Sequence, residues 1–217
     1  MANEFDRRVI SPVILAFIRE CQKRVPCHLG GGAALAGVYL RHRMTGDIDL
    51  FSHEADEMRM LVRVLSDAAA SAGVSVTIVR DVGALVRATV KWSDGELELD
   101  VVHEPVADIE PPPPPLEGIV VESLSDLRAN KLTCILSRSE PRDLVDLYFL
   151  DCAGHPPERD LELALKKDAG IDPGVLAWLL SRFPTTPLPM MLEPLTTEQL
   201  QEFRDALAER FRRIAAP

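Results

Sequence analysis

The stretch Leu29–Phe51 reads LGGGAALAGVYLRHRMTGDIDLF, and it decides how the N-terminal half of the chain folds. Its three glycines stand where a short extended segment meets an apolar, alanine-rich run, which predicts a helix over residues 33–41. A Thr-Gly turn follows, and apolar and acidic residues then alternate over residues 47–52, as in a strand. The stretch therefore predicts a strand, a glycine turn, a helix and a second strand in close succession.

The second strand of this stretch carries two carboxylates, Asp47 and Asp49. Because residues two apart lie on the same face of a strand, we expect both carboxylates on one face. Ile48 and Leu50 would then enter the core. Two carboxylates held so close repel each other unless a cation lies between them, and Mg²⁺ prefers such oxygen ligands. Taken alone, the same pattern also fits a solvated polar face at the end of a strand.

The glycines before the helix are typical of a phosphate-binding turn. At Gly31 and Gly32 a strand turns into a helix, so backbone N–H groups and the positive end of the helix dipole converge there. Without side chains at these positions, phosphate oxygens can approach the backbone closely. A tight turn also needs glycine for steric reasons, so the paired aspartates nearby are what favour the phosphate site.

A third carboxylate comes from the predicted strand over residues 97–102, where Glu98 and Asp100 share a face. We prefer Asp100, because the apolar residues after it indicate a strand that enters the core. An in-line phosphoryl displacement commonly uses two metal ions to stabilise the attacking and leaving oxygens. Asp47, Asp49 and Asp100 are therefore the predicted ligands of Mg²⁺, with two ions expected.

The rest of the chain predicts an α+β fold with a helical C-terminal half. Amphipathic spacing predicts helices over residues 5–24, 54–72, 123–137, 142–152, 158–167, 173–182 and 197–214, and extended runs predict strands over residues 74–79, 84–92 and 119–121. The turn Ser93-Asp94-Gly95 indicates a hairpin, and the prolines Pro111–Pro115 exclude a helix or a central strand. We expect an α/β core over residues 1–103, a proline-rich connector over residues 104–118, and a helical domain over residues 119–217 that completes the active cleft.

The composition indicates a soluble protein with an apolar core. Hydrophobic residues make up 47% of the chain, and no apolar run approaches the ~20 residues of a membrane-spanning helix. The start of the chain carries charges, so we do not interpret it as a signal peptide. The four cysteines form no CxxC or zinc-ligand pattern. We expect a cytoplasmic protein with free thiols and no membrane partner.

The net charge of −10 argues against nonspecific binding of long nucleic acid, which usually needs a basic surplus. A contact with RNA would need a local basic groove. The residues available for such a groove are Arg41, Arg43, Arg80, Arg87 and Lys91. The histidines that we interpret as surface or loop residues are His28, His42, His53, His103 and His155.

These motifs resemble the DNA polymerase β-like nucleotidyltransferases, which place a glycine pair, a helix, a D-x-D strand and a later aspartate strand in this order. Within them, GG-x-A-L followed by R-x-T-x-D-I-D-L-F is similar to the AbiEii/MenT group of nucleotidyltransferase toxins. The matching positions are Gly31, Gly32, Ala34, Leu35, Arg43, Thr45, Asp47, Ile48, Asp49, Leu50 and Phe51. In the helical half, the group's lysine helix motif and its K/R-D-x-x-D-L-Y motif match residues 126–132 and 142–148.

The resemblance implies a polymerase β-like core with a mixed sheet and flanking helices, followed by an α-helical bundle. It implies Mg²⁺-dependent transfer of an NMP from an NTP (ATP, GTP or CTP) to an acceptor. Lys131 would contact the triphosphate, and Asp143 would be the second essential residue of the helical half. The residues expected to contact the nucleotide are Gly31, Gly32, Arg43, Thr45 and Lys131. The acceptor hydroxyl would be activated by metal, or by Asp100 as a base.

Three of these positions also have other interpretations. The superfamily often has Ser or Thr after the glycines, whereas this chain has Ala33, so a phosphate contact there would come from the backbone or from Thr45. Lys131 fits an exposed helix lysine as well. Asp143 also fits a surface ion pair with Arg142, or a partner that orients Lys131.

The toxin group implies that the acceptor is the 3′ end of tRNA or a protein, and that a cognate antitoxin exists in a toxin–antitoxin or phage-defence system. Two other functions stay open. One is a small-molecule nucleotidyltransferase, such as one that modifies a cationic aminoglycoside. The other is a non-catalytic, nucleotide-binding interaction module, which Ala33 favours and the intact set of aspartates with Lys131 disfavours.

Overall fold

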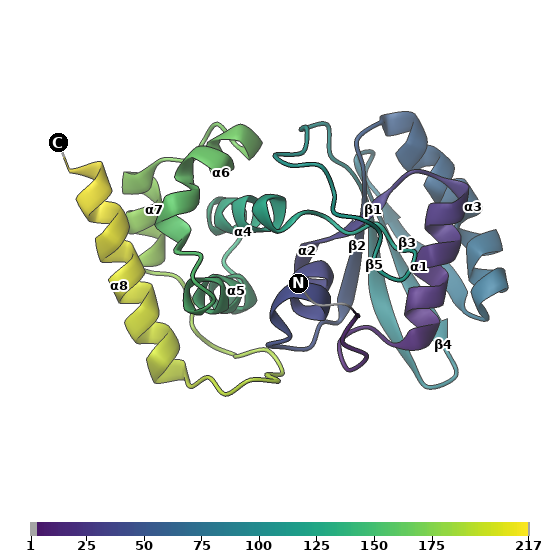
Figure 1. The fold of residues 1–217 in the computed structure, drawn as a ribbon, viewed down its shortest axis with the longest axis horizontal. Coiled ribbons are helices and arrows are strands. Elements are labelled where there is room, and N and C mark those ends of the chain that lie inside the picture. Colours follow the sequence, from purple (N-terminus) through teal and green to yellow (C-terminus); the bar gives the residue numbers. More distant parts are fainter. Residues whose placement is uncertain (1–3, 217) are drawn as a thin grey trace. The chain divides into compact units, whose positions relative to one another are not determined.

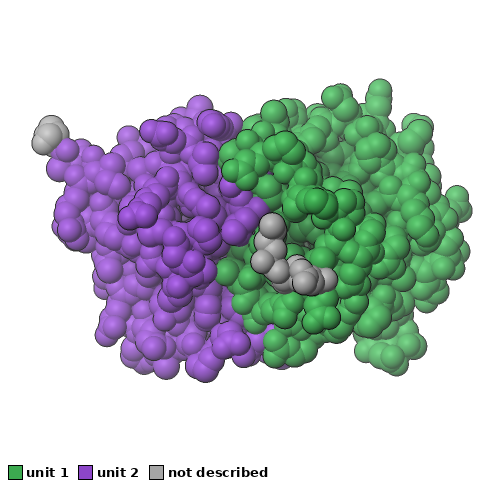
Figure 2. Space-filling view, in the orientation of Figure 1, with its two compact units in different colours: residues 1–41, 45–123 green, residues 42–44, 124–217 purple. Residues whose placement is uncertain are grey.

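The computed structural model describes residues 4–216 of the protein, which form two compact units (Figure 2). The first unit comprises the described residues up to 41 together with residues 45–123. The second unit contains residues 42–44 and the described chain from residue 124 onward. The three-part division expected from the sequence stays a prediction.

A mixed sheet of five strands forms the centre of the first unit, as far as the chain is described (Figure 1). The strands are β1 (His28–Gly30), β2 (Asp47–Ser52), β3 (Ser75–Asp81), β4 (Leu85–Trp92) and β5 (Gly95–His103), in the spatial order β1-β2-β5-β4-β3. β2 and β5 run parallel, and the other neighbouring strands run antiparallel. The mixed sheet and the strands predicted around it are confirmed, with small shifts at the strand ends.

Helices cover the apolar face of this sheet. α3 (Ala55–Ala72) packs on β2, β3 and β5, and α1 (Pro12–Arg24) packs against α3 (Figure 1). Ile48 and Leu50 of β2 are fully buried, whereas Asp47 and Asp49, which alternate with them, are half-buried. The predicted alternation of β2 is therefore confirmed, because only one of its faces enters the core.

The glycine turn leads from β1 directly into a helix. This helix begins at Gly31 as α2 (Gly31–Ala34), continues as the π-helical segment η1 (Leu35–Leu40), and ends at Arg41. Arg41 has a left-handed backbone with φ 56°, which stops the helix. The predicted helix over residues 33–41 is thus confirmed with an earlier start, and π-helical turns within helices are frequent at functional sites.

Two elements differ from the sequence-based expectation. The predicted helix over residues 5–24 begins only at Pro12, because proline suits the first helical position and Asp6 diverts its carboxylate to the backbone N–H of Arg8. The predicted strand over residues 119–121 forms only isolated bridges, Leu29 with Val121 and Leu116 with Ile119. The residues with positive φ at positions 117 and 118 bend the chain before a longer ladder can form.

The second unit is helical throughout its described length. Its helices are α4 (Leu124–Ser137), α5 (Pro141–Cys152), the 3₁₀ turn η2 (Pro157–Asp160), α6 (Leu161–Lys167), α7 (Pro173–Leu180) and α8 (Thr197–Ala215). α7 packs along α8, and α4 packs on both α5 and α6 (Figure 1). The predicted α-helical C-terminal half is therefore confirmed. Within the described residues, every helix is too short or too polar to cross a membrane.

Three residues from the N-terminal half belong to the helical unit. The His42 carbonyl oxygen accepts from the backbone N–H groups of Leu192 and Glu193, and the Met44 N–H donates to the Met190 carbonyl. The chain that joins η1 to β2 is therefore bound by backbone hydrogen bonds to the segment before α8.

Candidate active site

The sheet brings the predicted metal-binding carboxylates onto one face. In the parallel ladder of β2 and β5, Asp47 lies opposite Glu98 and Asp49 lies opposite Asp100. Register partners of adjacent strands point to the same side of a sheet, so all four carboxylates share the face that α3 leaves uncovered. The candidate carboxylate face therefore consists of two neighbouring acidic pairs.

The glycine turn lies directly against this carboxylate face. Gly31 has φ +61°, and a Cβ atom at this position would come 1.9 Å from the Oδ2 atom of Asp49. Only glycine allows this close approach of the backbone to a carboxylate, and only glycine adopts this φ without strain. The predicted phosphate-binding turn and the predicted metal ligands are thus adjacent in the first unit.

Arg87 lies beside the predicted metal ligands. From the sequence we expected this residue only in a possible RNA-binding groove. Its Nε donates to Oδ1 of Asp100 at 2.8 Å, and its Nη2 donates to Oδ2 at 2.7 Å. Its Nη1 also lies 3.4 Å from Oε2 of Glu98. Asp100 raises the pKa of Arg87, and the bidentate geometry fixes the plane of the Asp100 carboxylate. The signal was present in the sequence, because a hairpin centred on Ser93-Asp94 pairs residue 87 with residue 100.

Thr45 supports the first aspartate. Its hydroxyl donates to Oδ1 of Asp47 at 2.6 Å and also lies 3.1 Å from the Asp47 carbonyl oxygen. The structure therefore places Thr45 beside a predicted metal ligand. Its predicted contact with a phosphate stays a prediction.

Lys131 and Asp143 meet inside the helical unit. Lys131 of α4 is 4% exposed, and its Nζ lies 3.1 Å from Oδ1 of Asp143 and 2.7 Å from Oδ2 of Asp146, both on α5. The interpretation of Lys131 as an exposed helix lysine is therefore wrong. Asp143 is the partner of Lys131, as one of the alternatives expected, whereas Arg142 pairs with Glu140.

The segment that joins η1 to β2 brings two further side chains into this cluster. Arg43, which is 1% exposed, binds both oxygens of Asp146, with Nε to Oδ1 at 2.7 Å and Nη2 to Oδ2 at 2.8 Å. The Nε2 atom of His42 lies 2.7 Å from the same Oδ1 atom. Arg138 binds both oxygens of Asp143, at 2.7 and 2.9 Å. We call these six residues, His42, Arg43, Lys131, Arg138, Asp143 and Asp146, the buried charge cluster; five of them are buried, and Arg138 at its edge is partly exposed.

The charges of the cluster stabilise one another. Burial alone would lower the pKa of Lys131, but the Asp146 and Asp143 carboxylates outweigh burial and raise it. Burial acts to raise the pKa of Asp146, yet Arg43 and Lys131 hold that pKa well below its usual value. Burial lowers the pKa of His42, so the neutral ring donates its Nε2–H to Asp146. The cluster therefore contains two carboxylates and three cations that are all charged at pH 7.

Comparisons with known proteins identify the family of this chain. The sequence pattern of the nucleotidyl transferase AbiEii toxins, of type IV toxin–antitoxin systems, matches residues 14–217. The chain belongs to the AbiEii nucleotidyl transferase toxin family. It is accordingly a nucleotidyltransferase, and the resemblance inferred from the motifs is confirmed. No curated protein matches the sequence.

Solved structures share the fold of this AbiEii-family chain. A putative nucleotidyltransferase from H. pylori has a TM-score of 0.59 at 18% identity, over 94% of this chain and 93% of that one. JHP933 from Helicobacter pylori has a TM-score of 0.59 at 22% identity, over 95% and 94%. The MenT4 nucleotidyltransferase toxin from Mycobacterium tuberculosis has a TM-score of 0.53 at 16% identity, over 94% and 86%. At these identities the likeness shows a shared fold.

Several residues of this AbiEii-family chain differ in placement from the sequence-based expectation. His28 lies in β1 and is 5% exposed, so its interpretation as a surface or loop histidine is wrong. His42 does lie in the loop between η1 and β2, but its side chain is 0% exposed. Asp146 was not singled out, although it lies at the second aspartate of the K/R-D-x-x-D-L-Y motif and receives bonds from two chain segments. The spacing of three residues on a helix was the available signal, because it places Asp143 and Asp146 on one face of α5.

Proposed function

We propose that this protein transfers an NMP from an NTP at the carboxylate face of its sheet, with Mg²⁺ held by Asp47, Asp49 and Asp100. The observation that supports this proposal best is the ladder pairing of Asp49 with Asp100 beside the bare backbone of Gly31. The oxygens that we propose as metal ligands and the backbone that we propose as the phosphate site are thus adjacent on one face of one unit.

The donor set of this face fits a hard divalent cation. Four carboxylates, those of Asp47, Asp49, Glu98 and Asp100, stand on it, and the guanidinium of Arg87 lies beside Glu98 and Asp100. A cation that accepts oxygen ligands would stabilise this surplus of negative charge. Mg²⁺ is such a cation. Since Arg87 binds both oxygens of Asp100, binding of a metal at Asp100 would require the guanidinium to share or release that carboxylate.

Each residue of the face has a defined task in this proposal. Backbone N–H groups at Gly31 and Gly32 would bind the phosphates of the NTP. Thr45 orients Asp47, and Arg87 fixes the plane of the Asp100 carboxylate. Bound divalent metal would supply charge stabilisation at the phosphates and acidify the attacking hydroxyl. The Asp100 carboxylate is the alternative base for the proton of that hydroxyl.

In the helical unit, the resemblance leads us to propose Lys131, Arg43 and Asp143 as further functional residues. The buried charge cluster supports a positioning role for Asp143, because it binds Lys131 directly and holds it in a fixed place on α4. In the structure Lys131 and Arg43 are both bound to carboxylates. Contact of either residue with a triphosphate would exchange a carboxylate oxygen for a phosphate oxygen.

We further propose that the acceptor is the 3′ end of tRNA or a protein, and that a cognate antitoxin counteracts the transfer. Membership of a toxin family of type IV toxin–antitoxin systems supports both proposals. The net charge of −10 means that an RNA acceptor would need a local basic surface. A small-molecule acceptor and nucleotide binding without turnover are the other outcomes that the following experiment can give.

The experiment incubates the purified chain with Mg²⁺, one α-³²P-labelled NTP at a time and total tRNA, and separates the products on a denaturing gel. We expect label on RNA or on protein, and no label with Asp49→Asn, which removes the charge of a metal ligand but keeps the shape of the side chain. Asp94→Asn, in the exposed hairpin turn, is the matched control and should retain full activity. Wild-type labelling by Asp49→Asn would show that the metal assignment is wrong.

A further inference from the structure

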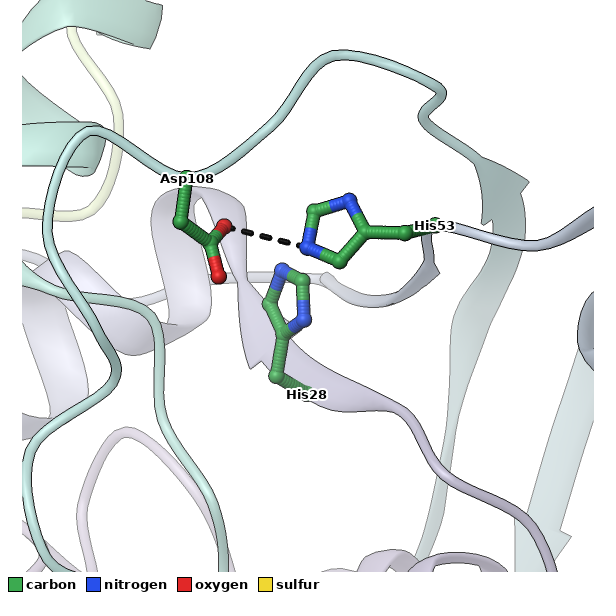
Figure 3. A group of neighbouring side chains, drawn as sticks. All are labelled: His28, His53 and Asp108. Carbon is green, nitrogen blue, oxygen red and sulfur yellow. Dashed lines mark ion pairs between the residues drawn. The ribbon is translucent and has the colours of Figure 1, made fainter.

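A second group of possible metal ligands lies at the other end of β2. His28 begins β1, His53 directly follows β2, and Asp108 comes from the proline-rich segment. Figure 3 shows the two imidazoles and the carboxylate turned toward one another, although the three residues come from distant parts of the sequence. His53 is four residues beyond Asp49, which corresponds to about 13 Å along a strand. This histidine group is therefore separate from the aspartates of the nucleotidyl transfer site.

The distances in this group suit a shared metal ion. Nε2 of His53 lies 3.1 Å from Oδ1 of Asp108, and the three candidate ligand atoms lie within 4.8 Å of one another. Two ligand atoms bound to one tetrahedral Zn²⁺ are about 3.3 Å apart, given metal–ligand distances of about 2.0–2.1 Å. The pair of His53 and Asp108 already has this spacing, and a candidate ligand nitrogen of His28 lies within 4.8 Å of both ligand atoms.

Neighbouring groups orient both imidazoles. Nδ1 of His53 lies 2.9 Å from the carbonyl oxygen of Glu104, so this nitrogen carries the proton in the neutral ring. In the neutral ring the lone pair of Nε2 points at the Asp108 carboxylate, and either a proton on Nε2 or a cation between the two groups relieves the repulsion. Histidines that bind metals commonly have a carbonyl partner of this kind on the other nitrogen. The ring of His28 is stacked on Phe51, at 5.6 Å between centroids, and is therefore held in one orientation.

The group also lies where an ion can enter. His28, His53 and Asp108 line a cavity of about 270 Å³ that also contacts Gln22 and Glu57. His28 is 5% exposed, whereas the side chains of His53 and Asp108 are 34% and 23% exposed. The ligand atoms are thus sheltered, but they remain accessible from one side.

We propose that His28, His53 and Asp108 bind a transition-metal ion of the Zn²⁺ type. Two imidazoles and one carboxylate are the ligands that Zn²⁺ accepts, whereas Mg²⁺ takes oxygen ligands only and favours the aspartate face. The ion joins the proline-rich segment to the ends of β1 and β2, because Asp108 comes from the former and the histidines from the latter. The bound ion holds that segment against the strand ends, whether or not NTP is bound.

A neighbouring group, His28, Glu104 and Glu122, also has ligand atoms within 4.8 Å and shares His28. It contains one imidazole instead of two, and Zn²⁺ is expected to prefer the group with more nitrogen ligands. The two groups cannot both use one nitrogen of His28 for separate ions. A variant in each group therefore decides between them.

The test measures binding of Zn²⁺ alone to the full chain, purified without a histidine tag and stripped with a chelator. Calorimetry should show one equivalent of Zn²⁺, and Co²⁺ in its place should give the intense visible absorption of a tetrahedral site. Asp108→Ala and His53→Ala should each weaken the affinity at least about tenfold, since even the loss of an outer partner costs about 10–100-fold. Asp108 is partly exposed, so its variant should fold even if the His53 variant does not.

Matched controls separate this site from other histidines and from the aspartate face. Asp94→Ala, His155→Ala and Asp49→Asn should all bind Zn²⁺ like the wild type. Absence of saturable binding, or unchanged affinity in both Asp108→Ala and His53→Ala, would overturn the proposal. Loss of binding in Glu122→Gln but not in His53→Ala would place the ion in the neighbouring group and would overturn it as well. Because Asp49→Asn abolishes transfer but leaves this site intact, failure here is distinguishable from failure of the proposed function.

Discussion

At the scale of single residues, Gly31 determines how closely the backbone approaches the carboxylate of Asp49. A methyl group at Gly31 would overlap the Oδ2 atom of Asp49, at 1.9 Å, and the φ of +61° would strain any other residue. Gly31→Ala should therefore destabilise the protein by at least about 1–2 kcal/mol through left-handed strain alone. It should also displace Asp49 and reduce transfer by up to about 100-fold, because a shift of about 1 Å in a catalytic group has that effect.

The control for this prediction is Gly46→Ala, one residue before β2. A Cβ atom at Gly46 meets nothing within 4 Å, so this variant should keep its activity and its stability within about 0.5 kcal/mol. Urea unfolding followed by circular dichroism and the labelling assay measure both variants. If Gly31→Ala were as active as Gly46→Ala, the glycine turn would have no part in binding phosphate.

Residues differ in how far their placement could be predicted from the sequence. The positions of Asp47 and Asp49 were predictable because the two-residue period of a strand is local. The burial of Arg43 and Lys131 was not, because long cations are almost always exposed unless paired. Their partner Asp146 lies 103 residues from Arg43, and no local pattern connects the two. Arg87 is intermediate, since counting back from the hairpin turn places it opposite Asp100.

At the scale of elements, the contact between α4 and α5 contains charge where an apolar interface would be expected. Lys131 is buried between Asp143 and Asp146, and removal of one partner of a buried ion pair leaves uncompensated charge. Lys131→Met should therefore cost about 3–5 kcal/mol of the free energy of unfolding, in addition to any loss of activity. Thermal and urea unfolding of the full chain measure this loss.

Arg138 offers a matched comparison for that prediction, because it binds the same Asp143 carboxylate from a side chain that is 40% exposed. Solvent can replace a partner in such a position, so Arg138→Gln should cost only about 0–1 kcal/mol. Equal losses in Lys131→Met and Arg138→Gln would contradict the assignment of Lys131 as the buried centre of the cluster.

Elements were predictable where one pattern extends over several turns or a full strand. β2, α3 and α5 were expected within a residue or two of their observed ends, because alternation or helical spacing runs through each of them. The N-terminal helix was predicted too long, because the apolar residues before Pro12 have helical spacing but form turns. The pattern over residues 119–121 covers only three residues, and a pattern this short does not distinguish a strand from isolated bridges.

At the scale of the whole molecule, the helical unit is assembled from two separate pieces of the chain. Residues 42–44 belong to it, and Arg43 and His42 supply Asp146 with two of its partners. The sequence indicated an α/β part followed by a helical part, because composition and periodicity change along the chain. It could not indicate that three residues before β2 belong to the later part, since this depends on a pairing across 103 residues.

This assembly predicts that the C-terminal piece of the helical unit, residues 124–217, is unstable when it is produced without residues 42–44. A fragment of residues 124–217 keeps Asp146 buried beside Lys131 but lacks Arg43 and His42. Loss of a buried guanidinium partner costs about 3–5 kcal/mol, a large part of the 5–15 kcal/mol that is typical of a whole domain. Circular dichroism and urea unfolding should therefore show a fragment that is far less stable than the same helices in the full chain.

One substitution tests this prediction in both contexts. In the full chain, Asp146→Asn leaves the buried Arg43 without its carboxylate, so the variant should be less stable than the wild type by about 3–5 kcal/mol. In the fragment of residues 124–217, Arg43 is absent, and Lys131 is the remaining buried cation bound to Asp146. There, Asp146→Asn should lower the free energy of unfolding by less than it does in the full chain. A fragment that is as stable as the full chain, or destabilised by Asp146→Asn to the same extent, would show that residues 42–44 do not hold the helical unit together.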